Sequence, residues 1–447
     1  MKKTRRKMGI DRLIALGFLG MILLGCALLC LPAASKDAPA SFLTGLFTAT
    51  SAVCVTGLTV RDTFTQWSGF GQTVLLCLIE VGGLGFMSIA SGLVLLLRGR
   101  FGMRDQMLMA QSIGATDSRR VIGLQKWVIG LSLAIESAGA LALTVRFLPS
   151  FGFRKALRLG VFHAVSAYCN AGFDLFGFLQ PGGSLAPFGR DAAVLLILSF
   201  LIVSGSLGFL VWEELFRVRR WKKLSVYTRL VLITTGLLLL LGSILFVCFE
   251  GKNPATLGPM GAGEKWLAAF FQSVTLRTAG FAALDQGALT DAGKGLSLFL
   301  MFVGGSSGST AGGMKTVTLV VLLLFLWSRL RGRSTVVVFH RTIPFSGVLN
   351  ALTIFGVMIL LSFAGAVFVC FDSGAGFVEA LYETVSAIAT VGLSCGLTPR
   401  LHPLSKLLII LYMYFGRVGV LTLSLGFLRE SQAEVRVRYA DAHLLIG

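Results

Sequence analysis

The chain has 447 residues, of which 55% are hydrophobic and 14% charged, and its mean hydropathy is +0.82. Soluble domains carry about 25% charged residues, so this composition excludes a soluble globular protein and predicts a multi-pass membrane protein. A net charge of +19 is typical of nucleic-acid-binding proteins, but the distribution of the charge excludes that class.

The first apolar run, residues 11–32, follows a basic start and resembles a signal sequence. Its "LLGC", which ends at Cys26, is similar to a lipoprotein cleavage site. The run is longer than the apolar core of a signal peptide, which has about 7–15 residues. We therefore interpret it as a first transmembrane span that is retained.

Seven further apolar runs are long enough to cross a bilayer, which needs about 20 residues. They are residues 69–97, 122–149, 188–216, 227–250, 292–330, 345–371 and 403–428. We predict eight transmembrane spans, an even number that places both termini on the same side of the membrane.

The basic residues concentrate in the termini and in alternate connections between these runs. The segments 1–13, 98–126, 217–229, 329–341 and 429–447 hold 25 Lys and Arg against six Asp and Glu, and the rest of the chain is neutral. Cytoplasmic loops carry the excess of Lys and Arg, so we predict that both termini are cytoplasmic.

Four connections on the opposite side contain a short, half-apolar segment that ends in a glycine. These are "FTATSAVCVTGL" (47–58), "FHAVSAYCNAGF" (162–173), "FFQSVTLRTAGF" (270–281) and "YETVSAIATVGL" (382–393). Their glycines, Gly57, Gly172, Gly280 and Gly392, are 115, 108 and 112 residues apart, which indicates a fourfold internal repeat. Segments this short must enter the membrane and return, which requires that they are buried in protein or line water.

The residues that end these segments predict an ion selectivity filter. Thr390-Val391-Gly392 reproduces the start of TVGYG, the potassium filter in which backbone carbonyls replace the hydration shell of the ion. Short helices before each glycine would direct their partly negative C-terminal ends at one axis. The predicted filter, with K⁺ at its backbone carbonyls, comprises Val55, Thr56, Gly57, Asn170, Ala171, Gly172, Thr278, Ala279, Gly280, Thr390, Val391 and Gly392. The alternative is a set of re-entrant caps in another kind of transporter.

The sixth run is too long for one span because a polar segment, "GGSSGSTAGGMKT" (304–316), interrupts it. Its glycines and hydroxyl side chains would break a helix. "GSTAGGMKT" is similar to the phosphate-binding motif GxxxxGK[ST], which would indicate an ATP-using enzyme. Met314 separates Gly313 from Lys315, however, and no parallel-sheet pattern surrounds the segment, so we predict no enzyme.

Together these motifs resemble the Trk/Ktr/HKT superfamily of potassium transporters over essentially the whole chain. "SAVCVTGL", "NAGFD", "RTAGF" and "ATVGLS" are similar to its filter motifs, and 304–316 to its intramembrane loop; the KtrB-type membrane subunit is the most similar type. The resemblance implies an all-α membrane protein of the bacterial inner membrane. It would have four pseudo-symmetric helix–pore-loop–helix repeats, with eight transmembrane spans and four re-entrant pore helices around one ion pore.

The same resemblance implies partners and boundaries. It predicts a homodimer in the lipid bilayer on a cytosolic ring of KtrA-type nucleotide-binding subunits, with K⁺ as the transported ion and no organic cofactor. It leaves open a stimulation by Na⁺. The repeats would occupy residues 1–98, 99–225, 226–342 and 343–429, followed by a cytoplasmic tail, 430–447.

In this family the intramembrane loop is the gate, and an arginine of the last span neighbours it. The matching gating residues are Gly304, Gly305, Ser306, Ser307, Gly308, Ser309, Thr310, Ala311, Gly312, Gly313, Lys315 and Arg417. Arg417 lies near the middle of its run, so we interpret it as a functional residue. The alternative is that its long side chain extends to the membrane surface. Lys315 either holds the loop by its carbonyls or lines a wet cavity.

Several residues depart from the pattern. Val420 stands where we expect proline, which would leave the last helix less kinked. Glu80 is an acid within the second run that faces a cavity or a buried partner, and we expect Arg277 to point behind the filter towards an acid.

Other polar residues leave alternatives open. Asp62, Asp174 and Asp285 follow three of the filter glycines and either concentrate cations at the pore mouth or belong to solvated loops. A glycine in all four filters favours potassium, and a sodium-translocating member of the superfamily is the alternative. The eight cysteines show no CxxC spacing, so we interpret them as packed thiols rather than as a metal site or a disulfide framework.

Overall fold

The computed structural model describes residues 10–85 and 121–419. Residues 1–9, 86–120 and 420–447 lie outside the described part. Several features predicted from the sequence therefore lie outside the described residues. They are the tail, Val420, most of the basic connection 98–126 and the far ends of the runs 69–97 and 403–428.

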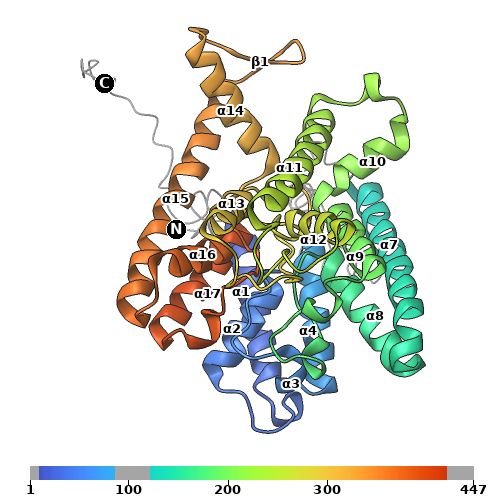
Figure 1. Cartoon of the computed structure of the whole chain (residues 1–447). Helices are drawn as coiled ribbons and strands as arrows, with labels where there is room; N and C mark the ends of the chain where they lie inside the picture. The colour runs from blue at the N-terminus through green and yellow to red at the C-terminus, as the bar shows by residue number, and fades with distance from the viewer. Residues whose placement is uncertain (1–9, 86–120, 420–447) are drawn as a thin grey trace, which may run out of the picture.

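Helices dominate the described residues, which confirms the predicted all-α class (Figure 1). Residues 10–85 form α1 (Ile10–Leu29), α2 (Phe42–Val53), the single-turn α3 (Thr63–Gln66) and α4 (Gly69–Leu84). After the gap come α7 (Val121–Phe151), α8 (Phe153–Tyr168), α9 (Ala192–Leu207) and α10 (Phe209–Val218).

The second half repeats the order of a long helix, a short helix and a return. It comprises α11 (Val226–Glu250), α12 (Ala262–Thr275), α13 (Asp291–Phe302), α14 (Thr316–Leu330), α15 (Phe345–Ser373), α16 (Phe377–Ile388) and α17 (Pro403–Val418). Between α14 and α15 lies an antiparallel hairpin of β1 (Val336–Val338) and β2 (Arg341–Ile343), in which Val336 pairs with Ile343. The sequence did not predict this hairpin.

Hydroxyl and carboxylate side chains begin many of these helices. Ser41, Ser68 and Ser225 accept hydrogen bonds from the first turns of α2, α4 and α11, as Asp191 and Thr290 do for α9 and α13. Such N-caps satisfy amide groups that would otherwise have no partner in the helix. These residues explain where the elements begin within an otherwise apolar sequence.

Three described helices are long and apolar enough to cross a membrane, namely α7 from Lys126, α11 and α15. The pair α9 and α10 passes the same test as a fourth, but it is bent by 93°. Several others, including α1, α4 and α14, are apolar but shorter. The eight-span count therefore remains a prediction.

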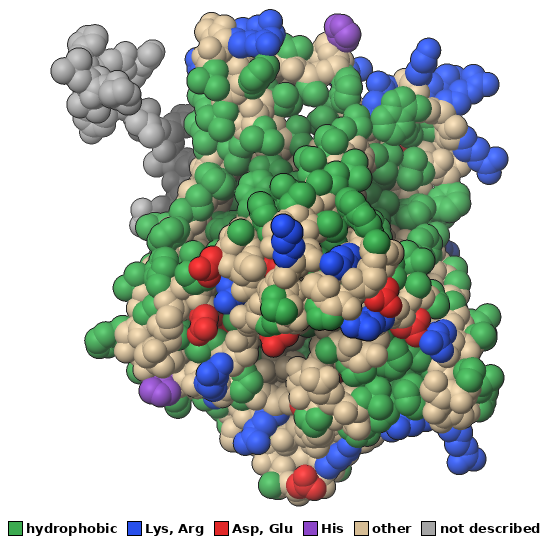
Figure 2. Space-filling view, viewed as in Figure 1, with side chains coloured by type: hydrophobic (Ala, Val, Ile, Leu, Met, Phe, Trp, Pro, Cys, Tyr) green, Lys and Arg blue, Asp and Glu red, His purple; other side chains and the backbone are tan. Residues whose placement is uncertain are grey.

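The helices expose many apolar side chains on the outside of the molecule. In Figure 2 hydrophobic side chains cover much of the visible surface, and Phe371 of α15 is 90% exposed. Exposed apolar surface of this extent is typical of contact with lipid. The short helices α2, α8, α12 and α16 each pack against the long helix that precedes them, and their C-terminal halves are buried.

Candidate ion pathway

The same unusual turn follows each of the four short helices. In every turn the glycine and the residue two positions before it both have positive φ: Val55 (56°) with Gly57 (96°), and Thr390 (52°) with Gly392 (92°). The other two turns use Asn170 with Gly172 and Thr278 with Gly280. Left-handed backbone is strained for β-branched residues such as valine and threonine. Strain that recurs at matching positions indicates a functional constraint on the backbone.

The four turns lie against one another in a closed ring. A Cβ atom placed on Gly57 would lie 2.6 Å from the carbonyl oxygen of Ala171, and one on Gly172 would lie 2.8 Å from that of Ala279. A Cβ atom on Gly280 would lie 2.6 Å from the Val391 oxygen. One on Gly392 would overlap the Thr56 oxygen, which closes the circle. Each glycine is therefore required both by its φ and by the neighbouring turn.

Hydroxyl groups of the short helices hold the turns from behind. Ser51 and Ser386 each accept a hydrogen bond from the glycine amide of their own turn, at 3.0 Å. Ser166 instead donates to the carbonyl of Phe173 at 2.7 Å. Alanine follows each of these serines, so a Ser-Ala pair recurs in three of the four segments and supports the turn.

The third turn has a different support. Ser273 stands one residue further from its glycine than the serines of the other three segments. It donates to α11 carbonyls at 3.1 and 3.3 Å. Thr275 takes its place and donates to the carbonyl of Phe281 at 2.8 Å. The irregular copy of the motif thus retains the contact with another residue.

Three threonine hydroxyls of the ring have no hydrogen-bond partner within the described part of the chain. They belong to Thr56, Thr278 and Thr390, and all three side chains are fully buried. A buried hydroxyl without a partner destabilises the fold by about 1–3 kcal/mol.

On one side the ring opens into a cavity of about 350 Å³. Asp62, Asp174 and Asp285 all line it, together with the four glycines. Asp62 accepts hydrogen bonds from the amides of Thr65 (2.8 Å) and Gly182 (3.1 Å). Burial raises the pKa of Asp174 to about 6, and the nearby charge of Asp62 adds to that shift. The structure therefore brings the three acids to one mouth.

On the other side the segment 304–316 lies directly against the ring. Its ends pair with each other, through Gly304 to Met314 (2.9 Å) and Thr316 to Gly305 (3.0 Å). The Thr310 hydroxyl donates to the carbonyl of Tyr168 at 3.0 Å. A Cβ atom on Gly312 would overlap the Thr390 hydroxyl. The loop therefore lies beneath the second and fourth turns.

Three cationic side chains donate to carbonyl groups of this loop. Lys315 donates to the carbonyl of Ala311 at 2.7 Å, a contact within the loop itself. Arg417 donates to the carbonyls of Thr310 and of Gly82 and Gly83, which joins the loop, α17 and α4.

Arg277 is the third of these cations. It donates to the Gly304 carbonyl at 3.1 Å and to the Thr316 hydroxyl at 3.2 Å. The prediction that it faces an acid is therefore wrong, because loop carbonyls and a hydroxyl supply its described contacts. The side chain is only 2% exposed.

A second set of glycines, in the returning helices, was not predicted from the sequence. Gly82, Gly205 and Gly416 lie where a Cβ atom would overlap the carbonyl oxygens of the last turns of α2, α8 and α16. Three residues later, Gly85, Gly208 and Gly419 end α4, α9 and α17 with φ of 85°, 89° and 92°. A GxxG spacing common to these runs was the available signal. Helix α17 ends at Val418, and Gly419 interrupts it directly before the position of Val420, where we expected proline.

Comparison with known proteins supports this architecture. Residues 24–436 match the family described as TrkH, cation transport protein. The chain is 38% identical to the potassium/sodium uptake protein NtpJ of Enterococcus hirae, over 100% of this chain and 99% of that protein. It is also 38% identical to the Ktr system potassium uptake protein B of Bacillus subtilis, over 98% and 96%. The crystal structure of the potassium transporter TrkH from Vibrio parahaemolyticus superposes with a TM-score of 0.73 at 19% identity, covering 96% and 86% of the two chains.

Proposed function

Because the chain belongs to the TrkH family of cation transport proteins, we propose that it takes up potassium through the ring of four turns. Its relatives in Bacillus subtilis and Enterococcus hirae are named as potassium and potassium/sodium uptake proteins. This family consists of multi-pass membrane transporters rather than enzymes. The observation that carries the proposal is the closed contact of Gly57, Gly172, Gly280 and Gly392 with the carbonyl oxygens of the neighbouring turns.

The ring provides what a selective cation pathway needs. In this proposal the turns direct their backbone carbonyls towards a common axis, where they replace the water around K⁺. The positive φ values that recur at matching positions of the four turns support it. The four short helices end at the ring, so their partly negative termini favour a cation there. The acids of the cavity raise the cation concentration at the mouth.

The loop 304–316 acts in this proposal as the gate. It lies under the ring, and Arg277, Lys315 and Arg417 hold its carbonyls. Positive charge beneath a cation filter opposes permeation as long as the loop keeps this position. Opening therefore requires that the loop moves away from the axis of the ring, or that Arg277, Lys315 and Arg417 exchange its carbonyls for other partners.

We further propose that both termini are cytoplasmic and that a ring of KtrA-type nucleotide-binding subunits docks on the basic end of a homodimer in the bacterial inner membrane. Basic side chains of 217–223 and of 329–341 gather at the end of the molecule that carries α10 and β1 (Figure 2). A reporter fused after Arg220 is expected on the cytoplasmic side, and one near Gly183 outside.

Uptake of rubidium into potassium-loaded liposomes tests the central proposal. We expect excess K⁺ to suppress rubidium uptake far more than the same concentration of Na⁺. Gly57→Ser should weaken that preference, because its side chain would displace the Ala171 carbonyl. Equal competition by the two ions in the unaltered protein would favour the sodium-translocating alternative, and an unchanged preference in Gly57→Ser would remove the first turn from the filter.

A further inference from the structure

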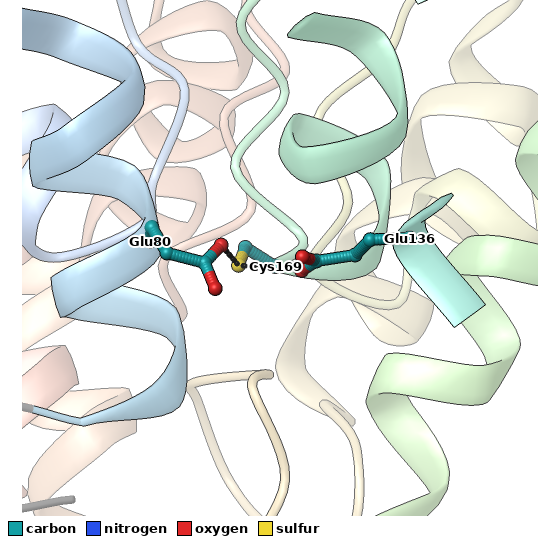
Figure 3. A group of neighbouring side chains, drawn as sticks. All are labelled: Glu80, Glu136 and Cys169. Atoms are coloured by element: carbon teal, nitrogen blue, oxygen red, sulfur yellow. Dashed lines mark hydrogen bonds between the residues drawn. The ribbon is translucent and has the colours of Figure 1, made fainter. Parts of the chain in front are cut away.

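A compact group of three metal-binding side chains lies behind the second turn. Glu80 of α4, Glu136 of α7 and Cys169, which ends α8, place a carboxylate oxygen, a carboxylate oxygen and a sulfur within 4.8 Å of one another. Figure 3 shows the three side chains converging from separate elements. Cys169 is fully buried and Glu136 is only 5% exposed.

The thiol of this group cannot satisfy both carboxyl groups. The Cys169 sulfur lies 3.5 Å from Glu80 and 3.9 Å from Glu136, and its single hydrogen can serve one of them. Within residues 10–85 and 121–419, the other hydrogen-bond partner of Glu136 is the carboxyl of Glu80. The two carboxyl groups therefore depend on a shared proton, and without that proton they would place unpaired negative charge in an apolar environment, which is costly.

Among the described residues no ion pair to Glu80 or Glu136 compensates the group. Arg417 interacts electrostatically with Cys169, but it donates its hydrogen bonds to the backbone carbonyls of Thr310, Gly82 and Gly83. The ion pairs of the described part join Arg146 to Asp191, Arg190 to Glu264 and Arg217 to Glu213, away from these acids. Buried negative charge at membrane depth requires a cation or bound protons.

We propose that Glu80, Glu136 and Cys169 form a binding site for a divalent cation of the borderline-soft class, with Zn²⁺ as the type ion. Around a tetrahedral zinc, a carboxylate oxygen and a thiolate sulfur lie about 3.6 Å apart, given bond lengths of about 2.1 and 2.3 Å. The observed separations of 3.5 and 3.9 Å need only small side-chain rotations to reach that geometry. A water molecule would take the fourth position.

The thiolate decides the class of ion. Sulfur ligands select zinc-like ions over K⁺, Na⁺ and Mg²⁺, which prefer oxygen. On binding, the thiol proton is released to solvent, so the affinity should rise with pH. The site is therefore distinct in chemistry from the carbonyl ring.

Occupancy of this site would act on the second turn of the ring. Cys169 directly precedes Asn170, whose φ of 59° begins that turn. Gly83, which packs against the Cys169 side chain, accepts a hydrogen bond from Arg417. A bound ion would thus join α4 and α7 to the turn, and we expect it to inhibit uptake. This consequence rests on the proposed function, whereas the binding itself does not.

The first turn offers a matched control. Cys54 is also three residues before its glycine and is also fully buried. It belongs to no group of metal-binding side chains among the described residues. Comparison of Cys54→Ser with Cys169→Ser therefore separates ion binding from the general effect of losing a thiol next to a filter turn.

Co²⁺ serves as the probe because its bond to a thiolate absorbs in the near ultraviolet. The full chain is purified in detergent with the two exposed cysteines changed, Cys77→Ser and Cys248→Ser. We expect one Co²⁺ per chain with a thiolate band that Zn²⁺ abolishes and excess K⁺ does not. The band should persist in Cys54→Ser, vanish in Cys169→Ser and need at least about tenfold more Co²⁺ in Glu136→Gln, a loss of about 1.4 kcal/mol.

Three results would overturn the proposal: no thiolate band in the parent protein, an equal band in Cys169→Ser, or loss of the band in Cys54→Ser as well. Elution and thermal unfolding that match the parent protein without metal show that each variant is folded. Glu136→Gln tests the site while the Cys169 thiol is retained. In liposomes, Zn²⁺ should inhibit rubidium uptake of the parent but not of Cys169→Ser, each normalised to its zinc-free rate. A parent that binds Co²⁺ but takes up no rubidium contradicts the proposed function and leaves the site intact.

Discussion

The ring of turns and the loop beneath it are built on opposite principles. In the ring, four segments repeat one backbone conformation, and each glycine meets the carbonyl oxygen of the next turn. In the loop region every polar contact is unique, because Arg277, Lys315 and Arg417 come from different parts of the chain and reach different carbonyls. The repeated part suits selection of an ion from all sides, whereas the unrepeated part suits a switch with two positions.

The difference also shows how each region tolerates change. The ring is sterically closed, so any added atom displaces a carbonyl. The loop is held by hydrogen bonds of about 0.5–3 kcal/mol each, which can be removed one at a time. We therefore expect abrupt loss of function from changes in the ring and graded gain of flux from changes in the loop.

The largest effect should come from Gly392→Ala. The new methyl group would overlap the Thr56 carbonyl oxygen, and the residue would have to keep φ at 92°. We expect rubidium uptake to fall by more than about tenfold, since each 1.4 kcal/mol of added barrier is a factor of ten.

Gly396→Ala is the matched control for this ring variant. Gly396 has a similar φ of 80°, but the nearest atom is the Arg400 side chain at 3.5 Å. Uptake should therefore fall much less than in Gly392→Ala. Equal losses in the two variants would show that backbone strain, and not closure of the ring, explains the result.

Deletion of Ser306–Ala311 should have the next largest effect, in the opposite direction. The deletion removes the segment that contacts Ser206 and Tyr168 and leaves the ring unchanged. Uptake should rise by up to about tenfold with its preference for K⁺ retained, if the closed state loses about 1.4 kcal/mol. Measured per folded protein, an unchanged or lower uptake would contradict the gating role.

Arg417→Gln should raise uptake by a smaller factor, about threefold. The variant loses the donors to Thr310, Gly82 and Gly83 but leaves Lys315 and Arg277 on the loop. Combined with the loop deletion it should add little, because both changes act on one element. Lys406→Gln, at the other end of α17, is the control and should leave uptake unchanged; a full additive gain in the double variant would place Arg417 outside the gate.

The smallest effect concerns pH at the mouth of the ring. The pKa of Asp174 is about 6, so its carboxylate is mostly charged at pH 7 and mostly neutral at pH 5. Loss of this negative charge lowers the local cation concentration, and uptake at low K⁺ should fall by up to about twofold on acidification. Asp174→Asn should remove this part of the pH dependence, and high salt should reduce it. The same pH profile in Asp174→Asn would assign the effect to another group.

Much of the ring could be predicted from the sequence because its constraints are local. A left-handed turn that packs against a neighbouring carbonyl accepts only glycine, so Gly57, Gly172, Gly280 and Gly392 recur in register. The Ser-Ala pair was visible as a repeat, although its contact with the turn appeared only in the structure. The GxxG spacing of the returning helices is a second local pattern, and it is visible in the sequence at Gly82–Gly85 and Gly416–Gly419.

The partners of isolated polar residues could not be predicted in the same way. Arg277 was expected to face an acid and instead binds the loop. Glu80 was recognised as an unusual acid, but Glu136 and Cys169 lie far from it in the chain; Cys169 is separated from Glu136 by 33 residues and from Glu80 by 89. Their spacing forms no motif, since three separate helices supply the ligands.

The amino-acid sequence by itself thus determined the membrane class, the fourfold repeat and the glycine positions of the turns. These follow from hydropathy and backbone sterics, which act on each segment regardless of its surroundings. Only the tertiary structure decided that the turns close into a ring, that three cations meet one loop and that Glu80, Glu136 and Cys169 converge. Such contacts depend on how helices that are distant in the chain pack together. This packing produces no periodic pattern in the sequence of any single helix.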